Sequence, residues 1–182
     1  AAHIGRSHTL TQWLDPSIVD EVDPDYRDAE LNLYDRNNPR QPPYDAAFIE
    51  QYRGAQRLRS QRISAWVLSR LEAFRREGEP LREQGFVVHG TMADPKWLDP
   101  TMDPNGRKPR WCFLGDPEVI NMSPIGLARF CTLRSWHSQW SDEYSNADGV
   151  RCAPKVTVPA LVIGNGADDA CTPGDTEALF NA

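Results

Sequence analysis

The longest regular pattern in this chain covers residues 45–77, where apolar side chains recur at helical spacing. They would form a stripe along one side of a helix; the positions are Phe48, Tyr52, Ala55, Ile63, Trp66, Val67, Leu71 and Phe74. Asp45 can cap the first turn, no proline interrupts the segment, and Gly78 can end it. The pattern therefore predicts one long helix.

The middle of this predicted helix is polar and rich in arginine. The residues concerned are Gln56, Arg57, Arg59, Ser60, Gln61 and Arg62. Such a face can bind an anionic ligand or a partner protein. It can also be a solvated face paired with acidic side chains, and we expect this second arrangement because the chain holds 26 Asp and Glu.

Three short apolar runs predict β-strands, at residues 86–90, 111–115 and 160–163. The last run follows Pro159 and ends at Gly164. A short apolar run between such residues is typical of a strand buried on both faces of a parallel sheet. Together with the helical segments, the runs predict an α/β fold class.

Shorter helical and loop segments complete the predicted order of elements. Asp15 and Pro16 suit the start of a short helix. Residues 21–43 are acidic and rich in Pro and Asn, which predicts a long surface loop. Helices are further predicted over residues 124–140 and 175–182.

Composition limits the functional classes. At 182 residues, the chain has the length of one domain with its own core. A net charge of −6 argues against a general nucleic-acid binder. No apolar run approaches the ~20 residues of a membrane span, and no signal sequence opens the chain. We expect a soluble, cytoplasmic protein.

The four cysteines, Cys112, Cys131, Cys152 and Cys171, lie far apart in the sequence. They form no Cys-x-x-Cys pair, and no histidine stands at a zinc-finger interval from any of them, so we expect neither a metal nor a cofactor. Reduced structural thiols are the expectation, and disulfides become the alternative if the protein is exported.

Two adjacent carboxylates, Asp168 and Asp169, follow the last apolar run where the predicted strand would end. Ligands and catalytic groups gather at the carboxyl ends of strands in open α/β sheets. Pro173 then stands where a new helix can begin. The alternative is a β-turn in which both side chains only bond local backbone N–H groups.

The order Gly-x-x-Asp-x-x-x-Pro formed by Gly166, Asp169 and Pro173 resembles the late acid-bearing turn of the α/β-hydrolase family. In that family the acid orients the catalytic histidine, and the resemblance gives this role to Asp169. Counting from the strand instead of from the glycine selects Asp168. Residues 4–10 and 129–136 also look like a bacterial group of this family whose substrates are poorly defined.

The resemblance covers only the late part of that family's pattern. No Gly-x-Ser-x-Gly elbow occurs, and no histidine follows Asp169. The resemblance therefore implies a partial α/β-hydrolase fold: residues 1–3 end a core strand, residues 4–150 form a helical lid, and residues 151–182 are a core segment with the triad acid. The nucleophile and the base would lie in the remainder of the hydrolase core, on the same or a partner polypeptide.

The implied activity is serine-hydrolase chemistry on a small acyl compound such as an ester, and the chain alone would be inactive. Tryptophans and methionines of the lid would shape an apolar acyl pocket. Two rival interpretations stay open. One is a non-enzymatic α/β binding module with a structural Asp pair, and the other is one chain of a two-chain hydrolase.

The histidines of the chain give no further catalytic candidate. His3 and His8 cluster with Gly5 and Arg6 in a short loop, which could face a cleft, but we expect a surface turn because no acid stands at a recognisable spacing. His137 lies in a tryptophan-rich segment, and we expect it in the core or at its rim.

Overall fold

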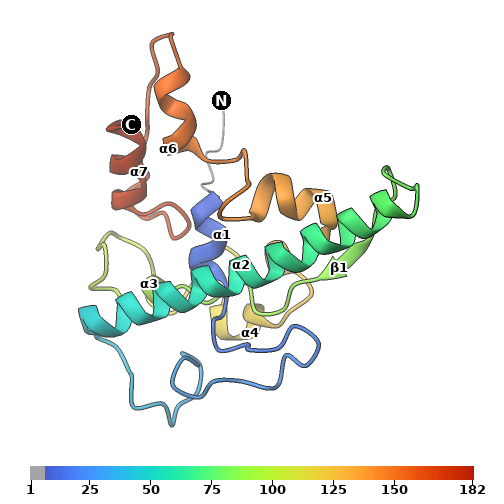
Figure 1. The fold of residues 1–182 in the computed structure, drawn as a ribbon. Coiled ribbons are helices and arrows are strands. Elements are labelled where there is room, and N and C mark those ends of the chain that lie inside the picture. Colours follow the sequence, from blue (N-terminus) through green and yellow to red (C-terminus); the bar gives the residue numbers. More distant parts are fainter. Residues whose placement is uncertain (1–6) are drawn as a thin grey trace.

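The computed structural model describes residues 7–182, with side chains of α1 from Leu10 onward. One long helix, α2, crosses the molecule, and α1, α5 and η1 pack against it (Figure 1). The helices are α1 (Ser7–Trp13), α2 (Ala46–Arg76), α3 (Pro95–Leu98), α4 (Pro117–Asn121), α5 (Leu133–Ser135), the π-helix η1 (Trp136–Trp140), α6 (Gly149–Cys152), the 3-10 helix η2 (Ala153–Lys155) and α7 (Pro173–Phe180). The strands are β1 (Gly85–Val87) and β2 (Phe130–Thr132).

The long helix α2 is confirmed, with both ends close to the predicted ones. The Asp45 carboxylate accepts a hydrogen bond from the Phe48 N–H at 2.7 Å. This N–H group lies in the first turn and has no hydrogen-bond acceptor within the helix. At the other end Gly78 has a φ of 80°, and the Glu79 N–H donates to the Phe74 carbonyl at 2.8 Å. This is a Schellman ending, in which the left-handed position favours glycine.

The predicted α/β fold class is wrong, and with it the partial α/β-hydrolase fold. Within residues 7–182 the only sheet is the antiparallel pair of β1 and β2, in which Phe86 stands opposite Cys131. The chain is mostly helical, and no parallel sheet is present in the described part. A strand needs a neighbour to satisfy its backbone groups, and an apolar run cannot reveal whether that neighbour exists.

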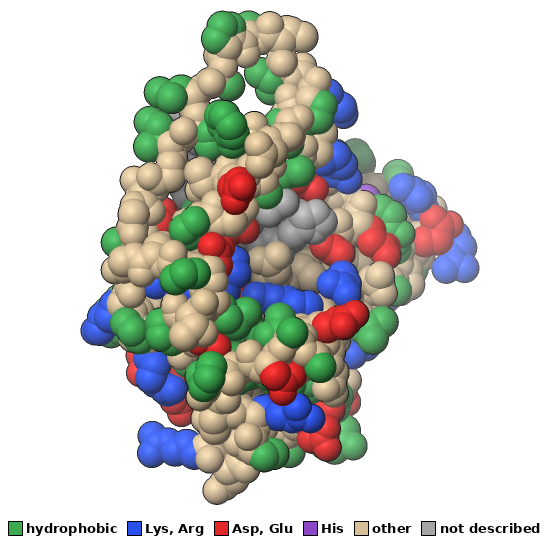
Figure 2. All heavy atoms as spheres, turned by 90° about the vertical axis from the view of Figure 1, so that its left-hand side faces the viewer, with side chains coloured by type: hydrophobic (Ala, Val, Ile, Leu, Met, Phe, Trp, Pro, Cys, Tyr) green, Lys and Arg blue, Asp and Glu red, His purple; other side chains and the backbone are tan. Residues whose placement is uncertain are grey.

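The run at residues 160–163, predicted as a strand, is an extended segment without a strand partner in the described structure. Its apolar side chains face solvent: Leu161 is 84% exposed and Ile163 73%. Val156 and Val158, just before it, are exposed as well. Figure 2 shows apolar side chains standing out along the loop at the top of the molecule, which follows α6 in Figure 1.

The other local predictions were partly right. The run at residues 86–90 contains β1, but residues 111–115 form a tight turn in which Cys112 and Gly115 exchange two backbone hydrogen bonds of 2.8 Å. Residues 21–43 form the predicted loop. Residues 124–140 are not one helix, because the chain passes through turns and β2 before α5 and η1 begin.

Two local features explain where the helix predictions failed. In the segment 124–140, Ala128 has a φ of 57°, which no α-helix contains, and the Thr132 side chain caps a new helix start at α5. Near Asp15, the carboxylate accepts from both the Ser17 N–H and the Ser17 hydroxyl. These bonds close a local turn, which competes with helix formation.

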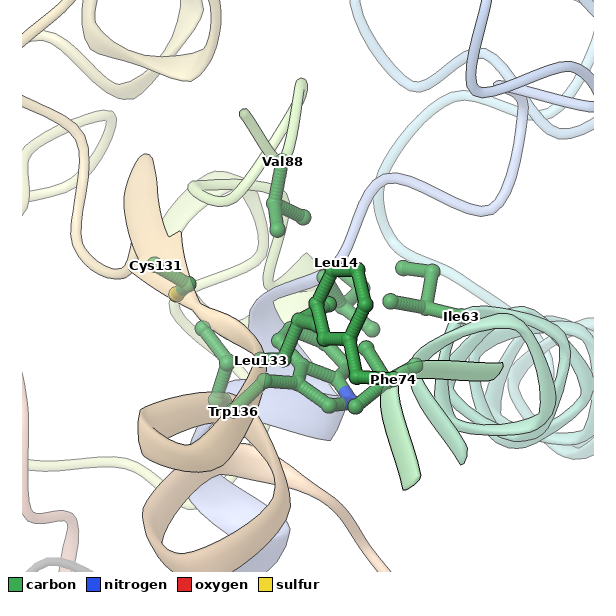
Figure 3. Packing of buried hydrophobic residues seen from close by; sticks show 9 residues of the cluster. Leu14, Ile63, Phe74, Val88, Cys131, Leu133 and Trp136 are labelled. Atoms are coloured by element: carbon green, nitrogen blue, oxygen red, sulfur yellow. The ribbon is translucent and has the colours of Figure 1, made fainter. Parts of the chain in front are cut away.

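The main core lies between α1, α2, β2 and η1. Figure 3 shows seven of its residues in close packing: Leu14, Ile63, Phe74, Val88, Cys131, Leu133 and Trp136. The Trp136 indole N–H donates to the Ser64 hydroxyl at 3.0 Å, so the buried ring keeps its polar group satisfied. A second cluster surrounds Trp13 and Trp97, and a third surrounds Tyr52.

The arginines of the polar middle of α2 pair with an acidic side chain as predicted, because Arg59 and Arg62 both bind Glu21. The predicted exposure to solvent is wrong for Arg59, which is buried. Arg59 is 1% exposed and forms two bonds to the Glu21 carboxylate, of 2.9 and 2.7 Å. It also donates to three backbone carbonyls, those of Asp15, His89 and Gly90. Arg59 thereby joins α2 to two loops, whereas Arg57 on the same helix is exposed, as predicted.

No helix in residues 7–182 is long and apolar enough to cross a membrane. The division at residues 3 and 150 stays a prediction. In the described part, residues 151–182 reach back to the body of the molecule through the segment after residue 164, and this contact builds the candidate site.

Candidate functional site

The acid-bearing turn consists of residues 165–172, and its two carboxylates have different environments. The Asp168 carboxylate accepts hydrogen bonds from the N–H groups of Ala170 and Cys171, both at 2.9 Å. The Asn165 amide donates to its other oxygen at 3.3 Å. Asp168 therefore holds the turn in shape, as the local-turn interpretation of the pair describes.

The Asp169 side chain is partly buried and accepts a hydrogen bond from its own backbone N–H, but it has no hydrogen bond to another side chain in the part of the chain that the structure describes. Its backbone is fixed, because the Trp97 indole N–H donates to the Asp169 carbonyl at 2.6 Å. The two acids therefore differ in role. The Asp168 carboxylate stabilises the turn, whereas the Asp169 carboxylate projects from a backbone that is fixed by the bond from Trp97.

Electrostatics set Asp169 apart as well. Burial, and next the negative charge of Asp168, raise the pKa of Asp169 above its ordinary value. A hydrogen bond from its own backbone and the positive charge of Arg107 oppose the shift only in part. A carboxylate in such a place gains from a cationic neighbour, because an opposite charge favours its ionised form.

Three hydrogen bonds attach the turn to α3 and to the loop that follows it. Besides the bond from Trp97, the Asn105 amide donates to the Asp168 carbonyl at 2.7 Å, and the Gly106 N–H donates to the Gly166 carbonyl at 2.8 Å. A Cβ at Gly106 would lie 3.1 Å from that carbonyl oxygen, which explains why a glycine suits this close contact.

A charged cluster fixes the turn to the start of α7. The Lys96 ammonium group donates to the Thr172 hydroxyl at 2.8 Å and lies 3.4 Å from the Asp103 carboxylate. The Thr172 hydroxyl donates to Asp175 at 2.8 Å and caps the helix together with it. The Gly174 N–H donates to Asp103 at 3.0 Å. Sequence reasoning missed Lys96 and Asp103, because nothing in the local pattern links them to residue 172.

Aromatic side chains lie next to the acid-bearing turn. Ala170 packs against the second core cluster, which contains Trp13, Met92 and Trp97. The ring centroids of Trp13 and Trp97 are 5.4 Å apart. Burial raises the pKa of the buried Cys112 thiol in this cluster, and the charge of Asp169 adds to the shift. Asp169 therefore borders an apolar region with low exposure to water.

A groove also flanks the turn on the side of α7. It has a volume of about 540 Å³. Its lining is mostly apolar and comes from both sides of the turn: Val162, Gly164, Asn165, Gly166, Pro173, Thr176, Glu177 and Phe180. A separate apolar hollow of about 370 Å³ includes Trp66 and Phe86. It adjoins β1, which lies at the opposite end of the molecule from α3 and α7 (Figure 1).

The remaining sequence candidates do not join this site. His3, Gly5 and Arg6 lie outside the described residues, and so does the side chain of His8. The His137 ring packs 4.9 Å from Tyr144 and is half-buried, which agrees with the expected rim position.

The cysteines and potential metal ligands form no second centre in the described part. All four thiols are free; Cys112 and Cys131 are buried, and burial raises the pKa of Cys131 to about 12. Within residues 7–182 no group of three or more His, Cys, Asp or Glu side chains is arranged to hold a metal ion.

Comparisons of the chain with protein-family models, with curated proteins and with solved structures found no match.

The raised pKa of Asp169 predicts an unusual pH dependence of stability. A raised pKa in the folded state means that folding favours the protonated acid. Asp169 therefore contributes its full stabilisation of the folded state below the ordinary pKa of 3.8, and this stabilisation is lost as the pH rises through the folded-state pKa. Asp169→Asn removes this titration. We expect the variant to gain stability relative to the parent as the pH rises from below 3.8 to neutral.

Asp168→Asn is the matched control and should have the opposite effect. It weakens the acceptor of two backbone N–H groups and should lower the free energy of unfolding by about 1 kcal/mol. Urea unfolding of the parent and both variants across this pH range is the measurement. A loss of stability at neutral pH in Asp169→Asn would contradict the described environment of Asp169.

Proposed function

We propose that this chain is part of a serine acyl hydrolase that acts on an ester or a related small acyl compound. Asp169 is the acid that orients a catalytic histidine. The nucleophilic serine, the histidine and the oxyanion donors belong to the remainder of the hydrolase core, on the same polypeptide or on a partner. The protein needs no metal or cofactor for this chemistry and is cytoplasmic.

One observation carries the proposal: two adjacent carboxylates differ in what they bind. Asp168 is occupied by two N–H groups of the turn, whereas Asp169 has no side-chain partner within residues 7–182 and has a raised pKa. The Asp169 carboxylate accepts only from its own backbone N–H, whereas Asp168 accepts from the N–H groups of two following residues and so closes the turn. The difference favours Asp169 over Asp168 as the acid, which the sequence had left open.

The proposed role of Asp169 follows from its charge and its held backbone. A histidine that takes the serine proton becomes positive, and a nearby carboxylate stabilises that charge and selects the correct tautomer. The same imidazolium would lower the raised pKa of Asp169, because opposite charges favour the ionised acid. The bonds from Trp97, Asn105 and Gly106 hold the backbone of the turn from which this carboxylate projects.

Surface chemistry supports a neighbouring polypeptide segment that completes the site. Val158, Leu161, Ile163 and Phe180 are each at least 68% exposed and lie in the same segment as the acid. Apolar side chains concentrated on one segment mark a surface that another part of a protein covers. The groove beside the turn offers mostly apolar walls for an acyl group.

The experiment is an esterase assay on the full polypeptide that contains these residues and on the 182-residue chain by itself. With p-nitrophenyl esters of increasing acyl length, we expect turnover by the former and none by the latter, since the chain has no Gly-x-Ser-x-Gly elbow. A folded full polypeptide that hydrolyses no ester or thioester would favour the non-enzymatic interaction module instead.

A further inference from the structure

The apolar hollow beside β1 lies apart from the acid-bearing turn and has a volume of about 370 Å³. This volume falls within the ~300–1,000 Å³ of ordinary ligand pockets. Most of its walls are apolar, and they come from the loop at residues 19–22, from the middle of α2 and from β1. Solvent reaches these walls, because Val22 is 92% exposed and Trp66 is 40% exposed. The hollow is therefore accessible to a ligand.

The hollow runs along one edge of β1. Phe86, Val87 and Val88 all line it. Successive side chains of a strand point to opposite faces of a sheet, so a hollow that contacts three consecutive residues lies beside the strand and not over one face. β2 pairs with β1 but does not line the hollow. The hollow therefore lies along the edge of β1 that has no strand partner in the described part of the chain.

Backbone groups of β1 are available at this open edge. The Val88 N–H, one position past the strand, donates to the Arg129 carbonyl of the paired segment at 2.9 Å. Residues of an antiparallel ladder turn alternately toward and away from their partner, so the N–H and C=O groups of Gly85 and Val87 face away from β2. Neither residue forms a backbone hydrogen bond to a third segment within residues 7–182. Such an edge is a template for a further strand.

Acidic side chains border the hollow on the side of the loop. Asp20 lines the hollow, and Asp23 and Asp25 follow in the same loop. All three are exposed, and none forms an ion pair with a Lys or Arg in the part that the structure describes. The Asp20 carboxylate accepts a local hydrogen bond from the Val22 N–H at 2.8 Å, which leaves its charge uncompensated. The loop therefore carries three negative charges.

The basic residues at the hollow do not cancel this charge. Arg62 lines the hollow and binds one oxygen of the Glu21 carboxylate at 2.9 Å, while Arg59 binds the other oxygen at 2.7 Å. Arg62 also donates to the Ile18 carbonyl at 2.9 Å. Two arginines and one glutamate sum to one positive charge, against the three negative charges of the loop. The border of the hollow is therefore net negative and complements a basic partner.

We propose that the open edge of β1 and this hollow bind an extended segment of a partner protein in which apolar residues alternate with Lys or Arg. The segment adds a strand to the sheet, and its backbone pairs with Gly85 and Val87. Its apolar side chains enter the hollow beside Trp66, and its basic side chains lie near Asp20. This surface does not depend on the proposed hydrolase activity, because none of its residues belongs to the acid-bearing turn.

The test is isothermal titration of the full polypeptide, at constant ionic strength, with the blocked peptide acetyl-Lys-Leu-Lys-Val-Lys-Leu-amide. We expect saturable binding of one peptide per chain. A peptide with Ser in place of Leu and Val keeps the charge and should bind at least about tenfold more weakly, because the apolar contacts are lost. A peptide with Glu in place of Lys should also bind more weakly, since its charge has the sign of the loop.

Two further peptides test the backbone pairing without changing the protein. One is N-methylated at its Lys amides and the other at its Leu and Val amides. A strand pairs through alternate residues, so at least one of the two should bind about fivefold more weakly than the parent peptide. Unchanged affinity of both methylated peptides would overturn the proposal.

Variants of the protein locate the surface. Val87→Pro removes the N–H that faces the open edge and leaves the Val88 bond to the paired segment, so it should weaken binding by about fivefold. Asp20→Asn keeps the local acceptor for Val22 and should weaken binding by about threefold. Circular dichroism of each variant confirms that the helical fold is kept.

Glu50→Gln is the matched control for Asp20→Asn, because it removes an exposed negative charge near the other end of α2. It should leave the affinity unchanged. Equal losses in Asp20→Asn and Glu50→Gln, or equal binding of the serine peptide and the parent peptide, would indicate general electrostatic attraction and overturn the proposal. So would the absence of saturable binding of the parent peptide.

Discussion

If the proposed function holds, Asp169→Asn should lower the kcat for ester hydrolysis by about 10⁴-fold while the fold stays intact. The amide has nearly the shape of the carboxylate, but it can donate its N–H₂ to the histidine and stabilise the wrong tautomer. It also no longer balances the positive charge that develops on the ring. The analogous change in a serine protease has an effect of about this size, equivalent to ~5 kcal/mol of barrier. Ester turnover at saturating substrate is the measurement.

Asp168→Asn provides the control at the neighbouring position. Because its carboxylate serves the turn, the change should cost stability and leave kcat within about tenfold of the parent value. If Asp168→Asn abolishes turnover and Asp169→Asn retains it, Asp168 and not Asp169 is the triad acid. Retained activity in both variants would show that neither is a triad acid.

Arg59→Ala should be the most destabilising single substitution among the polar residues of α2, by about 3–5 kcal/mol. The change leaves Glu21 with Arg62 as its remaining charged partner and removes a guanidinium donor from three backbone carbonyls. Two of them, those of Asp15 and Gly90, keep a backbone N–H donor. Burial raises the pKa of Glu21, but hydrogen bonds and charge from Arg59 outweigh it and lower the pKa overall. This stabilisation is therefore present above the ordinary pKa of Glu21 and is lost as the pH falls.

Arg62→Ala is the comparison, since Arg62 binds the same Glu21 carboxylate at 2.9 Å but has a side chain that is 45% exposed. An exposed ion pair contributes about 1 kcal/mol or less. Chemical unfolding of both variants at neutral pH measures the difference. Equal destabilisation by the two changes would contradict the buried role of Arg59.

The sequence predicted α2 well because its signals are local. The Asp45 cap, the apolar stripe and the Gly78 ending all act within the helix, and each is present in the structure. The burial of Arg59 could not be predicted in the same way. Its partners are Glu21 and the carbonyls of distant loops, which helical spacing does not reveal.

Two of the three predicted strands, at residues 111–115 and 160–163, failed for a related reason. An apolar run predicts that its side chains are buried, but it does not predict which surface covers them. Residues 160–163 have the composition of a buried strand and yet lie exposed, with no strand beside them in the described part of the chain. The apolar runs and helical segments of the sequence therefore could not show whether a parallel sheet forms.

For the candidate site, the sequence correctly predicted that Asp168 and Asp169 lie in a turn before a helix, and α7 begins at Pro173. It could not separate the two acids, because the difference depends on backbone N–H groups and on the bond from Trp97, 72 positions away. Only the folded chain shows that one carboxylate is occupied and the other has no side-chain partner within residues 7–182.

Labelling with a fluorophosphonate probe tests the central claim most directly. The full polypeptide, together with any partner that copurifies with it, is incubated with the probe, and the modified serine is located by peptide mass spectrometry. The account predicts one equivalent of label on a single serine outside these 182 residues, and no label on the 182-residue chain by itself. Stoichiometric label on any serine within the chain, or no label on the folded full polypeptide, would contradict it.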